Sequence, residues 1–159
     1  MRITLKKQID HLFQLFVIII VIVLASWIIF STNGTKLHLA AYSVPFIFIV
    51  MPTLVVHINY FLKNRRYDFE ILEDEIRISI DKKEYRIKPN ETSEVKYVIS
   101  PEMYETRHVW LPWNYYRHVE IYMNDGGKFV ITSLLTDDFS WLFHHGFNYE
   151  TKINFYRLA

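Results

Sequence analysis

The stretch "VEIYMNDGGKFVIT", residues 119–132, decides the fold of the second part of the chain. Apolar and polar side chains alternate before and after its centre, and this is the period of a strand with one buried face. The central Asn-Asp-Gly-Gly segment is typical of a hairpin turn, in which Gly126 and Gly127 are expected to supply positive φ angles. The stretch therefore predicts a β-hairpin that builds a sheet.

The same alternation recurs upstream of this hairpin, in "YDFEI" (67–71), "IRISI" (76–80), "EYRIK" (84–88) and "EVKYVI" (94–99). Strands with one apolar and one solvated face are typical of antiparallel sheets. In "VWLPWNYY" (109–116) the alternation is irregular, and Pro112 favours an edge, a bend or a bulge there. We therefore expect about six or seven antiparallel strands.

Helical spacing follows the hairpin, in "TDDFSWLFHHG" (136–146). Thr136 is the expected N-cap, Asp137 and Asp138 suit the first turn, and Gly146 is the expected stop. The last residues, 147–159, fit either a final strand or a tail, and the sequence does not choose between them.

The N-terminal part of the chain is very different, because it has two long windows without charge, 11–35 and 37–62. Each is longer than the roughly 20 apolar residues that cross a bilayer as a helix. We therefore predict transmembrane helices over about 12–30 and 39–62. The chain divides into a two-helix anchor, residues 1–66, and a domain, residues 67–159.

Basic residues flank the two predicted spans on the outer sides of the pair. The candidate membrane-interface anchors are Lys6, Lys7, Lys63, Arg65 and Arg66. By the positive-inside rule the N- and C-termini are both expected in the cytoplasm, in a multi-pass protein of the inner membrane. The second span also carries His57 and Asn59, which are expected near the cytoplasmic interface, with a bound ion or a proton relay as the alternative.

Charge and composition exclude several classes of function. The part before Tyr67 has seven Lys and Arg against one Asp, while the part from Tyr67 onward has eleven Lys and Arg against sixteen Asp and Glu. An acidic domain does not fit binding to nucleic acid, which depends on clustered Lys and Arg. The chain has no cysteine, so disulfides and thiolate chemistry are excluded.

The order of these elements resembles a known family. Two N-terminal spans, a basic exit, the start "YDFEILEDEIRIS" (67–79) and "KFVITSLL" (128–135) before an aromatic-rich helix are similar to bacterial PH-like (pleckstrin-homology-like) membrane proteins, including the YcxB-like branch. The resemblance implies a membrane α-helical hairpin followed by a mostly-β, α+β PH-like barrel with a C-terminal helix. It also implies a membrane-tethered interaction module rather than an enzyme. The basic loop of phosphoinositide-binding members is missing, because Glu73, Asp74 and Glu75 take its place.

The densest cluster of aromatic and basic residues lies in "RHVWLPWNYYRHVEIY" (107–122). Trp, Tyr and Arg most often anchor protein interfaces, and Trp and Tyr also favour the membrane surface. The candidate contact residues for a partner or the membrane are Arg107, Trp110, Trp113, Tyr115, Tyr116 and Arg117. The alternative is that these rings fill the core of a small barrel.

No catalytic, cofactor-binding or metal-binding motif is found in the sequence. The residues that come nearest to a set of metal ligands are His108 and His118, with Glu105 or Glu120 nearby. No supporting motif accompanies them. We therefore expect no enzyme activity and no cofactor. The expected function is a non-catalytic membrane module that holds a partner protein or a second copy of itself. The alternatives are a lipid or small-molecule sensor and, third, an enzyme or ion-handling protein.

Overall fold

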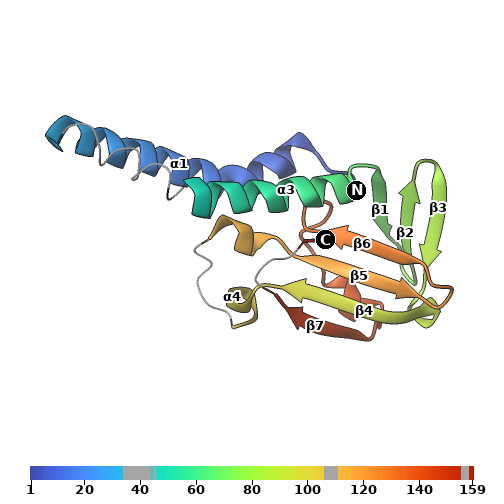
Figure 1. Cartoon of the computed structure of the whole chain (residues 1–159). Helices are drawn as coiled ribbons and strands as arrows, with labels where there is room; N and C mark the ends of the chain where they lie inside the picture. The colour runs from blue at the N-terminus through green and yellow to red at the C-terminus, as the bar shows by residue number, and fades with distance from the viewer. Residues whose placement is uncertain (34–43, 45, 106–110, 155–157) are drawn as a thin grey trace.

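The computed structural model describes residues 1–33, 44, 46–105, 111–154 and 158–159. Its N-terminal part is helical, with α1 (Leu5–Asn33), a π-helical turn (Phe46–Val50) and α3 (Met51–Asn64). Both helices run along one side of the strand-rich part of the chain, and α1 extends well beyond it (Figure 1). Two segments, Leu5–Ile28 and Phe46–Asn64, are long and apolar enough to cross a membrane.

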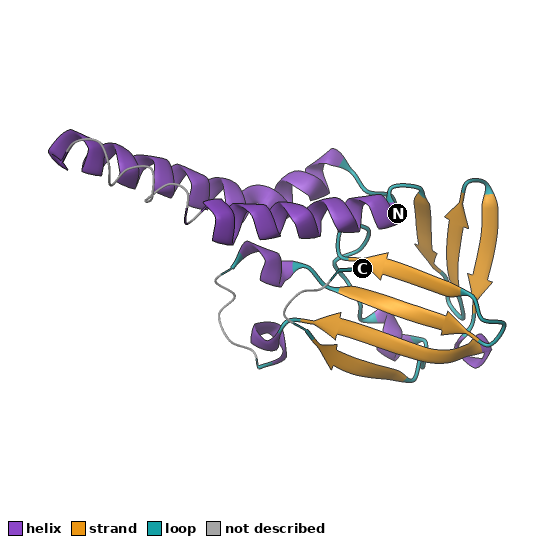
Figure 2. Cartoon of the chain, viewed as in Figure 1, coloured by secondary structure: helices purple, strands orange, loops and turns teal. Residues whose placement is uncertain are grey.

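In the described part of the chain, seven strands follow α3 and form two sheets (Figure 2). The first sheet has the order β1-β2-β3 and comprises β1 (Tyr67–Ile71), β2 (Ile76–Ile80) and β3 (Lys83–Ile87). The second has the order β6-β5-β4-β7 and comprises β4 (Thr92–Ile99), β5 (His118–Met123), β6 (Lys128–Thr132) and β7 (Tyr149–Ile153). Short helical turns connect them: η2 (Pro89–Glu91), α4 (Pro101–Tyr104), η3 (Pro112–Tyr115) and α5 (Trp141–His144).

The predicted inward faces of the strands meet in one apolar core. Ile76 and Ile78 of β2 and Val119 and Ile121 of β5 are fully buried in it. The hairpin of residues 119–132 is present, with β5 and β6 antiparallel and Val119 opposite Ile131. Of its two glycines only Gly126 has a positive φ, 88°, so one such residue is enough for this turn.

The predicted PH-like barrel with a C-terminal helix is only partly correct. Among the described strands, none of the first sheet is hydrogen-bonded to one of the second, so the barrel is not closed. The helix is a single turn, α5, and Thr136 does not cap it; the Thr136 hydroxyl instead donates to the Asp138 carbonyl. Phe139 and Trp141 are both buried, and side chains two residues apart do not share one face of a helix.

Within the last part of the chain, Tyr149–Ile153 form a strand, β7. β7 pairs with β4 in parallel, with Val95 opposite Tyr149, so the sheet is not purely antiparallel. Gly146 ends α5 as expected, with φ 69°.

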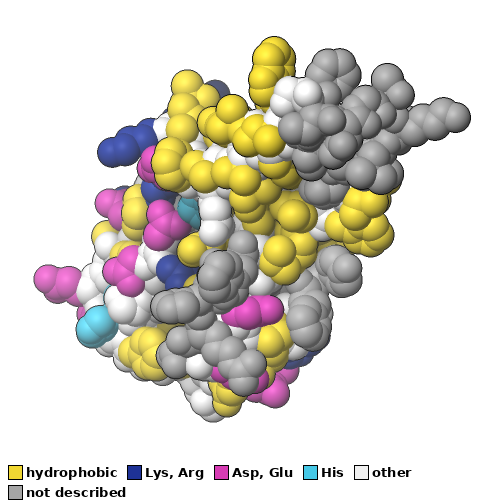
Figure 3. Space-filling model, turned by 90° about the vertical axis from the view of Figure 1, so that its left-hand side faces the viewer, with side chains coloured by type: hydrophobic (Ala, Val, Ile, Leu, Met, Phe, Trp, Pro, Cys, Tyr) yellow, Lys and Arg dark blue, Asp and Glu magenta, His cyan; other side chains and the backbone are white. Residues whose placement is uncertain are grey.

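Hydrophobic side chains gather over the helices, while acidic and basic side chains gather over the strand-rich part (Figure 3). Among the described side chains of α1, the exposed large apolar ones are Leu5, Ile9, Phe13, Phe16, Val17, Ile20, Val21, Val23, Leu24, Trp27 and Ile28. An exposed apolar surface of this extent marks an interaction site rather than ordinary protein surface.

Candidate functional site

The strongest candidate site is the junction at which the helices meet the strand-rich part. A second core lies there, formed by Val56 and Tyr60 of α3 with Tyr116 and Leu134. Tyr60, Tyr116 and Leu134 are fully buried, and Val56 is nearly so. One face of the end of α3 is therefore packed inside the folded structure.

Two histidine–tyrosine pairs cross this junction, and we call their four residues the His/Tyr cluster. A hydrogen bond of 2.7 Å joins His57 Nδ1 and the Tyr116 hydroxyl, and one of 2.8 Å joins the Tyr60 hydroxyl and His118 Nδ1. The rings of Tyr60 and Tyr116 meet edge to face, with centroids 5.3 Å apart. Each helix residue in the cluster thus has a partner in the strand-rich part.

The cluster is a buried, hydrogen-bonded core. Burial raises the pKa of Tyr116, so the phenol stays protonated at neutral pH. Buried hydrogen bonds of this kind fix one arrangement of the groups, because each unmatched partner costs roughly 1–3 kcal/mol. The cluster is therefore suited to hold the helices and the sheet in one orientation.

Asn64, the last residue of α3, bonds directly to the backbone of β6. Its Nδ2 donates to the Val130 carbonyl at 2.7 Å, and its Oδ1 accepts from the Thr132 N–H at 2.8 Å. β6 is an edge strand of the second sheet, and free edge groups would otherwise be open to pairing. The helix thereby covers this edge.

The first turns of α1 contact the same part of the molecule. The Lys7 ammonium donates to the Leu135 carbonyl at 2.5 Å, and His11 Nε2 lies 3.4 Å from Asp137 Oδ1. The ring of His11 also packs on Tyr116, with centroids 5.5 Å apart. The N-terminal end of α1 is therefore held at the junction, and its other end extends well beyond the strand-rich part (Figure 1).

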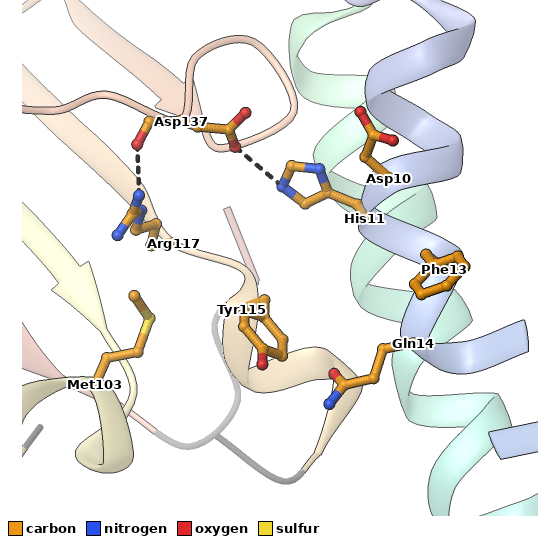
Figure 4. A pocket seen from close by; sticks show the side chains of 8 residues that line it. All are labelled: Asp10, His11, Phe13, Gln14, Met103, Tyr115, Arg117 and Asp137. Carbon is orange, nitrogen blue, oxygen red and sulfur yellow. Dashed lines mark hydrogen bonds and ion pairs between the residues drawn. The ribbon is translucent and has the colours of Figure 1, made fainter. Parts of the chain in front are cut away.

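A cavity of about 610 Å³ lies beside this junction (Figure 4). α1 contributes Asp10, His11, Phe13 and Gln14 to its lining. The rest of the molecule contributes Met103, Tyr115, Arg117 and Asp137. An Arg117 Nη2–H donates to the Asp137 carbonyl, and the guanidinium lies 5.5 Å from the centroid of the Phe139 ring. The guanidinium of Arg117 is thus already bonded within the molecule.

The predicted contact residues are spread over different environments. Tyr115 is 45% exposed, Trp113 and Arg117 are half-buried, and Tyr116 is fully buried in the His/Tyr cluster. Trp113 packs against the second core. Arg107 and Trp110 lie outside the described residues. Only Tyr115 therefore presents an exposed aromatic side chain from the described part of this set, and the segment Pro112–Tyr115 is a helical turn rather than a strand.

The predicted interface anchors lie at the same end of the helices as the junction. Lys6, Lys63, Arg65 and Arg66 are exposed. Arg66 pairs with Asp81 at 3.1 Å. Lys7 is half-buried because its ammonium is bonded inside the molecule.

The described part of the chain does not support a metal site at His108 and His118. His118 is bonded to Tyr60, and its Nε2 lies 3.9 Å from Glu120 Oε1. His108 lies outside the described residues. Within the residues that the structure describes, no three His, Asp or Glu side chains are placed to hold a metal ion.

The contacts of α3 were not among the residues predicted from the sequence, although a signal for them was present. His57, Tyr60 and Asn64 are spaced by three and four residues, so they share one face of a helix. A polar stripe at the end of an apolar helix indicates contact with something other than lipid. The spacing alone does not show that this contact is made with the strand-rich part of the same chain.

Comparison with known proteins identifies one family. A family model described as a PH domain matches residues 1–141, and the match therefore includes both helices as well as six of the strands. No curated protein and no solved structure matches the chain.

Proposed function

The chain belongs to the PH domain family, and we propose that it is a non-catalytic interaction module anchored in a membrane by α1 and α3. The family supports an interaction or lipid-binding role in general terms. We further propose that the two helices span the membrane, that the chain belongs to the YcxB-like branch, and that the membrane is a bacterial inner membrane. The single observation that carries the proposal is the junction, where side chains of the apolar helix α3 are built into the fold.

The exposure of α1 supports a membrane location. The helix has 29 residues, so at about 1.5 Å per residue it is roughly 43 Å long. Its first two turns are held at the junction, and the remaining length is close to the roughly 30 Å of a bilayer core. Trp27, near the far end, is 73% exposed. A core helix of a soluble protein would bury these side chains, whereas lipid would cover them here.

The orientation follows from the ends of the helices. The first residue of α1 and the last of α3 both lie beside the strand-rich part (Figure 1). The basic residues Lys6, Lys63 and Arg65 are at the same end, and basic residues favour the cytoplasmic side. Both termini and the PH-like part are therefore proposed to be cytoplasmic.

The junction determines how such a module would work. Because the His/Tyr cluster and Asn64 lock the PH-like part onto the helices, it cannot swing freely on a linker. Its surface stays at a fixed height and angle above the membrane, and confinement raises its effective concentration for other membrane proteins. The proposed partner is such a protein or a second copy of the chain.

Tyr115 is the centre of the proposed contact surface. It is exposed in η3, the turn that contacts both α1 and α3, and Trp110 and Arg107 precede it in the chain. Tyr116 is excluded from this surface because it is buried. Trp113, two residues earlier, packs against the second core and so helps to hold the turn that carries Tyr115.

The test is an affinity purification of the full chain from native membranes in mild detergent, followed by mass spectrometry and a mass estimate of the complex. We expect a stoichiometric partner, or a dimer, that is lost with Tyr115→Ala and Trp110→Ala. Tyr85→Ala is the matched control, because Tyr85 is 38% exposed on β3 in the other sheet. A lone monomer, or a partner retained by both variants, would contradict the proposal.

A lipid or small-molecule sensor remains the second candidate, because the cavity beside α1 lies next to the proposed membrane surface.

A further inference from the structure

The cavity beside α1 marks the level at which this helix would enter the membrane. After Asp10 the helix has no Asp, Glu, Lys or Arg, and the run without them extends over residues 11–35. A hydrocarbon core takes about 20 residues of helix, so a core that begins after Asp10 ends within α1. The residues of α1 that line the cavity are Asp10, His11, Phe13 and Gln14. The cavity therefore lies where α1 would pass from water into lipid.

The opposite wall of this cavity belongs in part to two short turns, α4 and η3. Met103 of α4 and Tyr115 of η3 line it, and η3 also contacts both helices. Both turns lie at the end of the strand-rich part towards which α1 extends (Figures 1 and 2). We call these two turns, residues 101–104 and 112–115, the rim. In the proposed orientation the rim therefore lies at the level of the lipid headgroups.

The rim presents aromatic side chains to its surroundings. Tyr104 is 57% exposed and Tyr115 is 45% exposed. Tyrosine is enriched at membrane–water interfaces, because its ring is apolar while its hydroxyl can stay hydrated. The next ring along the chain, that of Tyr116, is fully buried. The two tyrosines that stay exposed are thus those of the two turns at headgroup level.

The charges of the rim point to the interface itself rather than to anionic lipid. Neither turn contains Lys or Arg, while α4 contains Glu102 and is followed by Glu105. The basic residue of the cavity, Arg117, donates to the Asp137 carbonyl. Attraction to an anionic membrane surface depends on clustered basic residues. A contact of the rim with lipid therefore depends on its rings.

We propose that the rim rests in the headgroup layer of the bilayer, with Tyr104 and Tyr115 as its interfacial anchors. The inference rests on the proposed membrane function, because the level of the rim is taken from α1. A support at this end of the strand-rich part, in addition to the two helices, opposes tilting of the PH-like part. A partner that contacts Tyr115 is then met at the level of the headgroups.

The absence of cysteine from the sequence allows the depth of single residues to be measured. The full chain with Tyr104→Cys carries a nitroxide spin label in nanodiscs of phosphatidylcholine. Oxygen collects in lipid and a polar nickel complex stays in water, so the accessibility of the label to the two reports its depth. Ile20→Cys, 57% exposed along α1, is the reference for lipid, and Tyr85→Cys, 38% exposed on β3, is the reference for water.

We expect the label at Tyr104→Cys to be less accessible to nickel and more accessible to oxygen than the label at Tyr85→Cys. A label at Tyr104→Cys that is as accessible to nickel as the water reference, with Ile20→Cys in lipid, would overturn the inference and leave the proposed anchor standing. An aqueous signal from Ile20→Cys would contradict the proposed membrane function itself, and the inference would fall with it.

A second measurement tests whether Tyr104 holds the rim in place. Tyr104→Asp should raise the nickel accessibility of a label at Tyr115→Cys, because a charged side chain at this level is drawn towards water. Tyr85→Asp is the matched control and should leave that label unchanged. An equal effect of the two changes, or none from Tyr104→Asp, would show that Tyr104 is not an anchor.

Lipid composition distinguishes an aromatic contact from one driven by charge. We expect the depth of the label at Tyr104→Cys to stay the same when phosphatidylglycerol replaces part of the phosphatidylcholine, because the rim has no Lys or Arg. A label that reaches the lipid only when phosphatidylglycerol is present would overturn the inference.

Discussion

Asn64 pairs with Val130 as a neighbouring strand would, since its side-chain amide donates to the Val130 carbonyl at the outer edge of β6. The same amide accepts from the Thr132 N–H, so both groups of the Asn64 side chain are used. The last residue of an apolar helix thereby completes the hydrogen bonding of a sheet edge. This contact joins the two predicted parts of the chain.

Replacing Asn64 with Ala should therefore loosen the helices from the sheet. The change leaves the Val130 carbonyl and the Thr132 N–H without their partners, and we expect a loss of about 1–3 kcal/mol in the free energy of unfolding. Thermal melting of the full chain in mild detergent measures it. Lys63→Ala, one residue earlier and exposed, is the control, and an equal effect of the two changes would refute the role of Asn64.

The His57–Tyr116 pair should be energetically coupled. Tyr116→Phe keeps the ring but removes the hydroxyl that meets His57 Nδ1 at 2.7 Å. We expect each single change to destabilise the protein by about 1–3 kcal/mol and the double change, with His57→Phe, to cost less than the sum by about 1 kcal/mol. Tyr85→Phe combined with His57→Phe should be additive. Additivity of the first pair as well would show that the hydrogen bond is not shared.

Glu120 should make the stability of the sheet depend on pH. Burial opposes ionisation of its carboxyl, but hydrogen bonds from Lys128 and Tyr122 outweigh burial and lower its pKa below the ordinary value of 4.5. Because the folded-state pKa is depressed, the ionised form contributes stability above pH 4.5, and this contribution is lost as pH falls through the folded-state pKa.

The difference in melting temperature between the wild type and Glu120→Gln should therefore be largest near neutral pH and shrink towards pH 3. Glu150→Gln on β7 controls for the substitution itself. A difference that stays constant over this range would mean that the Lys128 contact at 2.8 Å does not stabilise the carboxylate.

The absence of cysteine from the sequence allows a clean test of membrane topology. Asp125→Cys places a single thiol in the exposed turn between β5 and β6, and Ser31→Cys places one near the far end of α1. In intact cells a membrane-impermeant maleimide should label Ser31→Cys and leave Asp125→Cys unlabelled until the cells are opened. The reverse pattern would invert the proposed orientation, and labelling of both without lysis would contradict a membrane-spanning pair.

Local alternation was enough to predict most of the strands. Ile76 and Ile78 follow the expected inward face because the two-residue period is a property of the extended chain itself. The helix predicted over residues 136–146 was mostly wrong. Its capping residues suit a helix start, but burial of both Phe139 and Trp141 outweighs that local preference.

Some parts of the candidate site could not be predicted from local patterns. Tyr116 and Tyr115 are adjacent in one aromatic run, yet one is fully buried and the other is exposed. Which ring turns inward depends on where α3 passes, and that contact joins residues 59 positions apart in the sequence. Likewise, the pairing of β7 with β4 is parallel and non-local, so the final segment fitted a strand and a tail equally well.

By itself the sequence determined the apolar helices, the alternating strands and the segregation of charge, because each depends on residues a few positions apart. Only the tertiary structure decided that the end of α3 is part of the core, that Asn64 covers the edge of β6, and that Asp10, Gln14 and Asp137 line one cavity. These arrangements depend on contacts between residues far apart in the chain, and such contacts form only when the helices and the sheets bury their surfaces together.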